Sequence, residues 1–119
     1  MKKEQNKCRI TEFYKSYFDE FFSKQPQKVK DKILWTIELI EEIENIPKIY
    51  LGPIKKGLYE IRVKQGNNIY RIFCFFYKGK IIVLMNGFQK KTQKTPKQQI
   101  EKALRIKKEY EDEKKAKKL

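Results

Sequence analysis

The middle of the chain contains three apolar segments, rich in β-branched and aromatic residues, separated by turns with room for only two residues each. Such segments are typical of β-strands, and two-residue turns join strands that run antiparallel. The sequence therefore predicts a three-stranded antiparallel sheet. The predicted strands span residues 58–64, 69–77 and 80–88, and the predicted turns are Gly66-Asn67 and Lys78-Gly79.

These turns also predict the register of the strands. The first turn places Arg62 opposite Arg71, and the second places Arg71 opposite Asn86, so that the three residues form a row across one face. The other predicted pairs are Glu60 with Phe73, Val63 with Tyr70, Cys74 with Val83 and Ile72 with Met85. The opposite face is predicted to be apolar and to comprise Tyr59, Ile61, Val63, Tyr70, Ile72, Cys74, Phe76, Ile81, Val83 and Met85.

Two arginines directly opposite each other on one sheet face repel. One explanation is that the first turn is Asn67-Asn68, which would place Arg62 opposite Phe73 and Lys64 opposite Arg71. The two arginines would still share a face as diagonal neighbours. The other explanation is an anion that bridges them, because guanidinium groups bind phosphate through paired hydrogen bonds. We favour the anion site.

The sequence on either side of these strands predicts helices. Apolar residues at spacings of three and four indicate the buried faces of two helices before the sheet. These residues are Phe18, Phe21 and Phe22 in the first helix, and Val29, Ile33, Ile37 and Ile40, widened by Leu34 and Trp35, in the second. The expected elements are a strand over 8–14, a helix over 16–25, a helix from Pro26 to before Pro47, and a loop over 48–57.

A last helix is expected to begin near Pro96. Thr95 is a good N-cap, Pro96 suits the first helical position, and Gln98 completes a capping box. The end of the chain, residues 113–119, is expected to fray. We expect one domain over residues 1–119, because no repeat or linker divides the chain.

The positive charge is concentrated in the second half of the chain. Residues 1–54 carry 10 Lys and Arg against 9 Asp and Glu, whereas residues 55–119 carry 19 against 6. This asymmetry indicates a polyanionic partner, which could be nucleic acid, an acidic membrane surface or an acidic protein. The alternative is a charged surface that serves only solubility. No apolar run approaches the ~20 residues of a membrane-spanning helix.

The composition also excludes several kinds of chemistry. The chain has no histidine, and its only cysteines are Cys8 and Cys74. This rules out a Ser-His-Asp or Cys-His arrangement, a zinc pattern and a disulfide framework. Two separated thiols and no signal peptide predict a cytoplasmic protein.

Lysines surround the predicted arginine row. Lys90 and Lys91 follow the third strand, and Lys55 and Lys56 precede the first. We therefore expect a polyanion to lie on the open face of the sheet, with these lysines around it.

The motifs "GLYEIR" and "YRIFCFF", a lysine–glycine hairpin and "GFQKKTQKTPKQQIEKA" resemble the RelE/HigB superfamily of toxins from type II toxin–antitoxin pairs, most closely its phage-derived HigB-like branch. The resemblance implies an α+β fold in which an N-terminal helix pair packs on one face of a small antiparallel sheet and a C-terminal helix follows. It implies a cytoplasmic, metal-independent endoribonuclease that needs no cofactor and cuts mRNA on the ribosome. It also implies a helix-turn-helix antitoxin as partner, in a higher-order complex.

The resemblance assigns roles to residues of this chain. Arg62 and Arg71 would bind the phosphate, and Lys90 and Lys91 would contact it or transfer protons. Phe88 would stack on a base, although ordinary burial explains an aromatic residue there equally well. The remaining residues expected to bind substrate are Lys55, Lys56, Lys64 and Lys94.

Asn86 stands where relatives often have a histidine. An amide can form hydrogen bonds but does not transfer protons near neutral pH. Either a lysine whose pKa is lowered by neighbouring arginines acts instead, with Lys55, Lys56, Lys90 and Lys91 as candidates, or catalysis is lost. In the second case the chain would be a non-catalytic basic module that binds RNA or an antitoxin.

Overall fold

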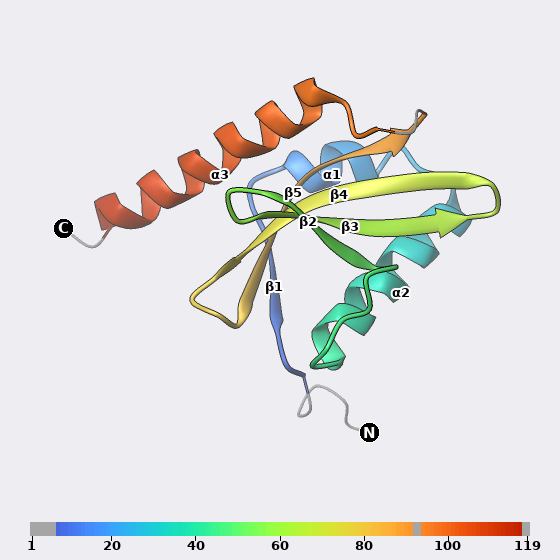
Figure 1. The fold of residues 1–119 in the computed structure, drawn as a ribbon, viewed down its shortest axis with the longest axis horizontal. Coiled ribbons are helices and arrows are strands. Elements are labelled where there is room, and N and C mark those ends of the chain that lie inside the picture. The colour runs from blue at the N-terminus through green and yellow to red at the C-terminus, as the bar shows by residue number, and fades with distance from the viewer. Residues whose placement is uncertain (1–6, 92–93, 118–119) are drawn as a thin grey trace.

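The computed structural model describes residues 7–91 and 94–117, which form a five-stranded sheet and three helices (Figure 1). Two helices precede the central strands and one follows them, as the sequence predicts. The elements are β1 (Ile10–Phe13), α1 (Tyr17–Phe22), α2 (Gln27–Glu42), β2 (Leu51–Lys55), β3 (Leu58–Gln65), β4 (Asn68–Tyr77), β5 (Ile81–Lys90) and α3 (Lys97–Lys117).

The sheet is mixed, with the strand order β1-β5-β4-β3-β2. Strands β2 to β5 pair antiparallel, but β1 pairs parallel with β5. The expectation of a purely antiparallel sheet is therefore wrong. It is also wrong that residues 48–57 form only a loop, because Leu51–Lys55 is an edge strand. Pro53 is compatible with this position, since an edge strand leaves one side of its backbone unpaired.

The first hairpin has the predicted register. Arg62 pairs with Arg71, and the Gly66-Asn67 turn is confirmed by a φ of 62° at Gly66, where glycine has no steric cost. The predicted pairs Glu60 with Phe73 and Val63 with Tyr70 are also present. The like charges of the two arginines therefore do lie directly opposite each other.

The second hairpin does not have the predicted register. Tyr77 pairs with Ile81, so the turn holds three residues, and Cys74 pairs with Leu84 instead of Val83. The register shifts again beyond Cys74, where β5 has two residues, Met85 and Asn86, against the single Phe73 of β4. Such a bulge re-aims the side chains that follow it. Arg71 consequently pairs with Phe88, and Asn86 is not part of the arginine row.

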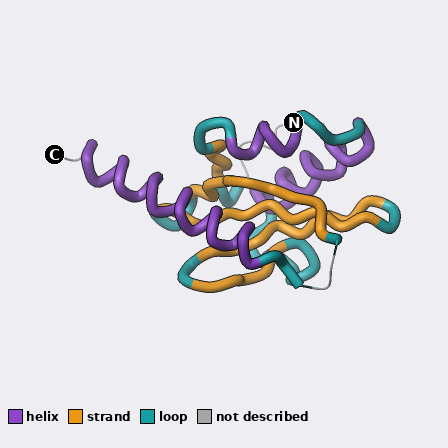
Figure 2. Tube along the Cα trace, turned by 90° about the horizontal axis from the view of Figure 1, so that it is seen from above, coloured by secondary structure: helices purple, strands orange, loops and turns teal. Residues whose placement is uncertain are grey.

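Helices cover both faces of the sheet (Figure 2). The predicted pair α1 and α2 packs on one face, and α3 packs on the other, which the sequence analysis took to be open. The shifted register turns Val83 and Met85 toward α3, whereas they were expected on the face of the helix pair. The first core is formed by Phe18, Phe21, Val29, Ile33, Ile37, Ile40, Ile61, Val63, Tyr70, Ile72, Cys74, Ile82 and Leu84. The second is formed by Tyr14, Leu58, Phe73, Phe75, Val83, Met85, Ala103, Ile106 and Tyr110.

The exposed and buried sides of the helices follow their sequence patterns. In α2 the four predicted core residues are buried, but Leu34 and Trp35 are about half exposed. In α3 the buried residues end at Tyr110, and the helix continues beyond the sheet to Lys117 (Figure 1). That helical end includes part of the segment 113–119, whose fraying in solution stays a prediction. No helix among the described residues offers the apolar length that a bilayer span needs.

Candidate phosphate-binding site

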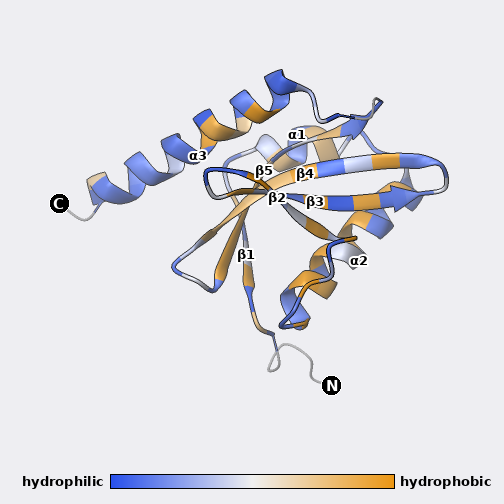
Figure 3. Ribbon diagram, in the orientation of Figure 1, coloured by the Kyte–Doolittle hydropathy of each residue, from blue (hydrophilic) through white to orange (hydrophobic). Residues whose placement is uncertain are grey.

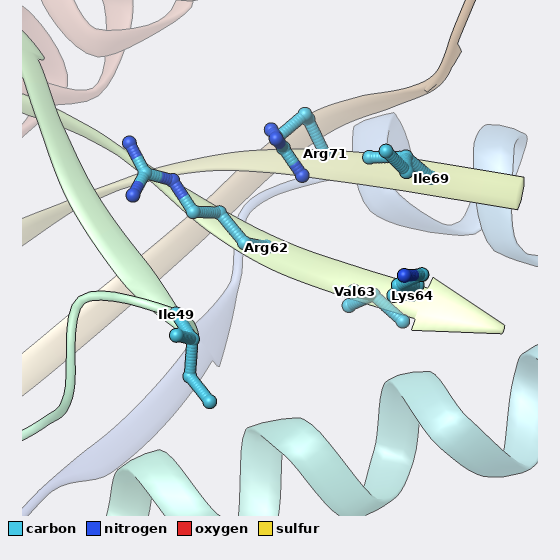
Figure 4. A pocket seen from close by; sticks show the side chains of 6 residues that line it. All are labelled: Ile49, Arg62, Val63, Lys64, Ile69 and Arg71. Atoms are coloured by element: carbon cyan, nitrogen blue, oxygen red, sulfur yellow. The ribbon is translucent and has the colours of Figure 1, made fainter. Parts of the chain in front are cut away.

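The paired arginines of β3 and β4 form the centre of the candidate site. Figure 4 shows both guanidinium groups on the same side of the two strands. The Nε of Arg62 lies 3.1 Å from Oε2 of Glu60, and the Nε of Arg71 lies 3.3 Å from the same oxygen. One carboxylate oxygen therefore sits between two guanidinium groups and offsets their repulsion.

Glu60 is buried beneath this pair. Its side chain is only 5% exposed, compared with 33% for Arg62 and 13% for Arg71. Its second oxygen, Oε1, accepts a hydrogen bond of 3.2 Å from the hydroxyl of Thr95. The anion that bridges the arginines is thus supplied by the chain itself. The predicted pairing of Glu60 with Phe73 already puts its side chain on this face, but no role was predicted for it.

A signal for Glu60 was present in the sequence. It lies two residues before Arg62 on the same strand, and side chains at that spacing share a face. It is also the last acidic residue before Glu101. An acid alone among basic residues on one sheet face is the natural partner of the paired arginines.

The position of Arg62 is fixed by the backbone around it. Its Nη1 donates a 2.8 Å hydrogen bond to the carbonyl oxygen of Lys48. Its guanidinium lies against Gly52 of β2, and a Cβ at that position would collide with Cζ, Nη1 and Nη2 of the arginine. Gly52 therefore leaves the space in which the guanidinium lies.

Arg71 is the more enclosed of the two arginines. Burial lowers the pKa of its guanidinium, while the charge of Glu60 acts in the opposite direction. Arginine titrates so far above neutrality that it stays protonated. Its Nη1 donates to the carbonyl oxygen of Tyr70 at 3.3 Å. The site thus holds one partly exposed and one largely buried positive charge.

Two further basic residues flank the arginine row. Lys64 pairs with Ile69, which pairs with Lys90, so the three form the next row on the same face. A small pocket of about 170 Å³ lies among these rows, lined by Ile49, Arg62, Val63, Lys64, Ile69 and Arg71 (Figure 4). The alternation of hydrophilic and hydrophobic residues along β3 and β4 is visible in Figure 3.

Phe88 is at the end of the arginine row, opposite Arg71. Its ring stacks on Phe73 with 5.7 Å between centroids, and it is partly buried against the second core. Packing in the core therefore accounts for part of the Phe88 ring, and stacking on a base stays a prediction.

The other candidate lysines occupy different places. The hydrogen bond of Thr95 to Glu60 brings the connection between β5 and α3 to the site, and Lys94 in that connection is exposed. Lys91 is exposed directly after β5. The expectation that Lys55 and Lys56 surround the arginines is not met. Lys55 pairs with Leu58, and Lys56 lies in the turn before β3, at the end of that strand that is away from Arg62.

Asn86 lies apart from the arginine row. It is 3% exposed, and its amide Nδ2 donates to Oε1 of Gln99 on α3 at 3.2 Å. The prediction that Thr95 is the N-cap of the last helix is wrong. The Thr95 hydroxyl bonds Glu60, and the Pro96 carbonyl accepts the first helical hydrogen bonds of α3. Pro96 therefore takes the N-cap position, and Lys97 is the first helical residue.

Comparison with known proteins identifies the family to which the chain belongs. No curated protein matches the chain. Residues 20–108 match the model of a family described as phage-derived protein Gp49-like (DUF891), a span that contains β2 to β5, most of α3 and every arginine and lysine of the site. This family is associated with the toxins of toxin–antitoxin pairs and falls within the RelE/HigB-like superfamily, with whose fold the sheet and helices are compatible. The chain belongs to the phage-derived Gp49-like family.

Proposed function

We propose that this protein is the toxin of a toxin–antitoxin pair and acts as a metal-independent endoribonuclease on mRNA bound to the ribosome. The observation that carries the proposal is the pair of facing arginines on β3 and β4, held by one buried carboxylate. Guanidinium groups in fixed positions stabilise the charge that develops on a phosphate during cleavage.

The proposed reaction uses the RNA's own 2′-hydroxyl. Its oxygen forms a bond to phosphorus while the bond from phosphorus to the 5′-oxygen breaks, which yields a cyclic phosphate and a 5′-hydroxyl. The 2′-hydroxyl proton must be accepted, and the leaving oxygen must receive one. Arg62 and Arg71 stabilise the charge on the phosphate.

Glu60 and Lys90 are the groups that we assign to proton transfer. A phosphate that binds the guanidinium groups competes with Glu60 for them, and the carboxylate oxygen that lies between the two arginines would then accept the 2′-hydroxyl proton. Lys90 is in the row next to Arg71, and we assign it the role of proton donor to the 5′-oxygen. Lys64, Lys91 and Lys94 would hold the RNA backbone, and Phe88 would stack on a base.

A second candidate function is supported by a separate observation. Asn86 is buried against α3 and has no titratable side chain, so the group that relatives often place there is missing. A protein that binds RNA or an antitoxin without cutting would keep the arginines and need no proton transfer. Both functions depend on the same basic face.

Inducible expression in bacteria, with growth recorded and mRNA 5′ ends mapped, separates the two functions. The cleaving toxin stops growth and creates new 5′ ends within translated mRNA. Arg62→Ala or Arg71→Ala should abolish both effects while the protein stays folded, and Arg71→Lys should impair them, because lysine lacks the paired contact. Lys80→Ala, in the β4–β5 turn, serves as the matched control. Growth arrest without new 5′ ends would favour the binding module.

Salt tests the shared part of the proposal. Binding of the purified protein to ribosomes should weaken steeply as the salt concentration rises, because cationic contacts to phosphate release counterions. Ribosome binding that stays unchanged between about 50 and 200 mM salt would show that the basic face does not bind phosphate.

A further inference from the structure

Strand β3 extends beyond the strand that covers its edge. Pairing with β2 ends at Leu51 and Ile61, and one more bond, of 2.8 Å, joins the Arg62 amide to the Tyr50 carbonyl. The Tyr50 amide instead donates to Pro47, where the chain turns away. Because backbone groups two residues apart point the same way, the N–H and C=O of Lys64 face outward beyond the end of β2.

A groove lies along this uncovered edge, between β3 and α2. It has a volume of about 490 Å³. The residues that line it are Lys32, Thr36, Ile49, Tyr50, Arg62, Lys64 and Gly66. Three of them are cations and none is an acid, so the groove favours an anionic occupant.

The groove also has exposed apolar side chains at its mouth. Ile49 is 70% exposed and, in Figure 4, points away from the two guanidinium groups. Trp35 is 46% exposed, and its ring meets that of Tyr50 edge-on with 5.8 Å between centroids. Large exposed apolar side chains beside a free strand edge are features of protein-binding surfaces.

We propose that this edge binds an extended, acidic segment of a polypeptide, which adds to β3 as a short parallel or antiparallel strand. The outward N–H and C=O of Lys64 match the backbone of a peptide, whereas RNA has no equivalent alternation of donors and acceptors. A side chain opposite Lys64 would lie on the arginine face, and its neighbours would point toward α2. The segment should therefore alternate acidic residues with apolar ones.

This inference rests on the proposed function, because it identifies how a neutralising partner would engage the toxin. An acidic side chain opposite Lys64 lies on the same face as Arg62 and beside it. It would compete with RNA phosphate for that guanidinium. A strand added at this edge thus blocks the phosphate site from the edge of the sheet, without covering the face on which the arginines lie.

The single tryptophan makes the test direct, since Trp35 is beside the groove and no other tryptophan contributes to the fluorescence. The probe is a synthetic peptide, Val-Glu-Val-Glu-Val, titrated into the full-length protein. One control peptide carries an N-methyl group on each glutamate, and another has glutamine in place of glutamate. We expect the first peptide to change the Trp35 emission saturably and both controls to bind at least roughly tenfold more weakly, the loss expected for one or two hydrogen bonds or ion pairs.

Protein variants provide the second arm. Lys64→Pro removes the outward N–H while leaving the hydrogen bonds to β4, and Lys64→Glu reverses the charge. Both variants should bind the peptide more weakly, by a factor similar to that of the control peptides. Lys80→Glu makes the same charge change in the β4–β5 turn and should have no effect. Equal binding of the N-methylated and unmodified peptides would overturn the proposal. Binding of an eight-nucleotide RNA in the groove, with no binding of the peptide, would also overturn it. Mapping of mRNA 5′ ends is independent of this titration, so loss of cleavage and loss of peptide binding are distinguishable.

Discussion

Gly52 of β2 lies directly against the guanidinium of Arg62 on β3, in a space that no other residue type would leave open. The absence of a side chain at Gly52 allows Arg62 to lie across β2. There its guanidinium group contacts both the Lys48 carbonyl oxygen and the Glu60 carboxylate. The position of the Arg62 side chain on β3 is therefore set by the absence of a side chain on the neighbouring strand.

Gly52→Ala should displace Arg62 and reproduce its loss. The added Cβ collides with the guanidinium, which is the flexible end of its side chain, so the fold should survive while RNA binding falls. We expect an effect on ribosome binding close to that of Arg62→Ala, and no further effect when the two changes are combined. Filter binding of ribosomes by the unchanged protein, the two single variants and the double variant measures these effects. Additive losses in the double variant would show that Gly52 acts elsewhere.

Glu60→Gln should separate stability from binding. Without the carboxylate, Arg62 and Arg71 repel across the strands, and we expect a loss of about 1–3 kcal/mol in the free energy of unfolding. RNA affinity should rise, because a phosphate no longer competes with Glu60 for the arginines. Urea unfolding and ribosome binding measure the two effects. Glu101→Gln, at an exposed position of α3, is the control, and unchanged stability in Glu60→Gln would contradict the bridging role.

Asn86→His should not create a catalytic residue. Asn86 is buried and bonded to Gln99, away from the arginine row, so a larger imidazole at this position has to break that bond and be accommodated beside α3. We expect a loss of roughly 1–3 kcal/mol in unfolding free energy and no gain in cleavage. New mRNA 5′ ends that appear only in this variant would show that the position faces the substrate.

Alkaline pH should destabilise the protein through Tyr14. Burial, followed by the nearby carboxylates Glu109 and Glu113, raises the pKa of Tyr14 to about 12, above its ordinary value of 10. The folded state therefore keeps a proton that the unfolded state loses, so this contribution to stability is complete below pH 10 and is lost between about pH 10 and 12. Tyr14→Phe should flatten the decline by up to about one proton, as measured by urea unfolding at several pH values. An equally steep decline in the variant would assign it to other groups.

The parts of the fold that sequence predicts well are those fixed by local contacts. The Gly66-Asn67 turn determines the first hairpin, so the facing arginines follow from counting residues. The apolar spacing of α2 predicts its buried face for the same reason. In both cases residues close together in the sequence determine the local structure.

The parts that sequence does not predict depend on partners far away in the chain. The bulge at Met85 and Asn86 removes Asn86 from the arginine row, and no local residue pattern marks it. Strand β1 pairs with β5, about 70 positions later, and α3 covers a face whose polar residues suggested exposure. Glu60 was visible in the sequence, but its role requires knowing that both arginines turn toward it.

The parallel pairing of β1 with β5 has a consequence for the time at which the protein becomes a folded molecule. Strand β1 has its partner in β5, about 70 residues later, so β1 has no strand to pair with until β5 has been synthesised. Contacts between such distant segments form late and slowly. The antiparallel strands β3 to β5, whose partners are close in the sequence, can therefore pair before β1 completes the edge of the sheet.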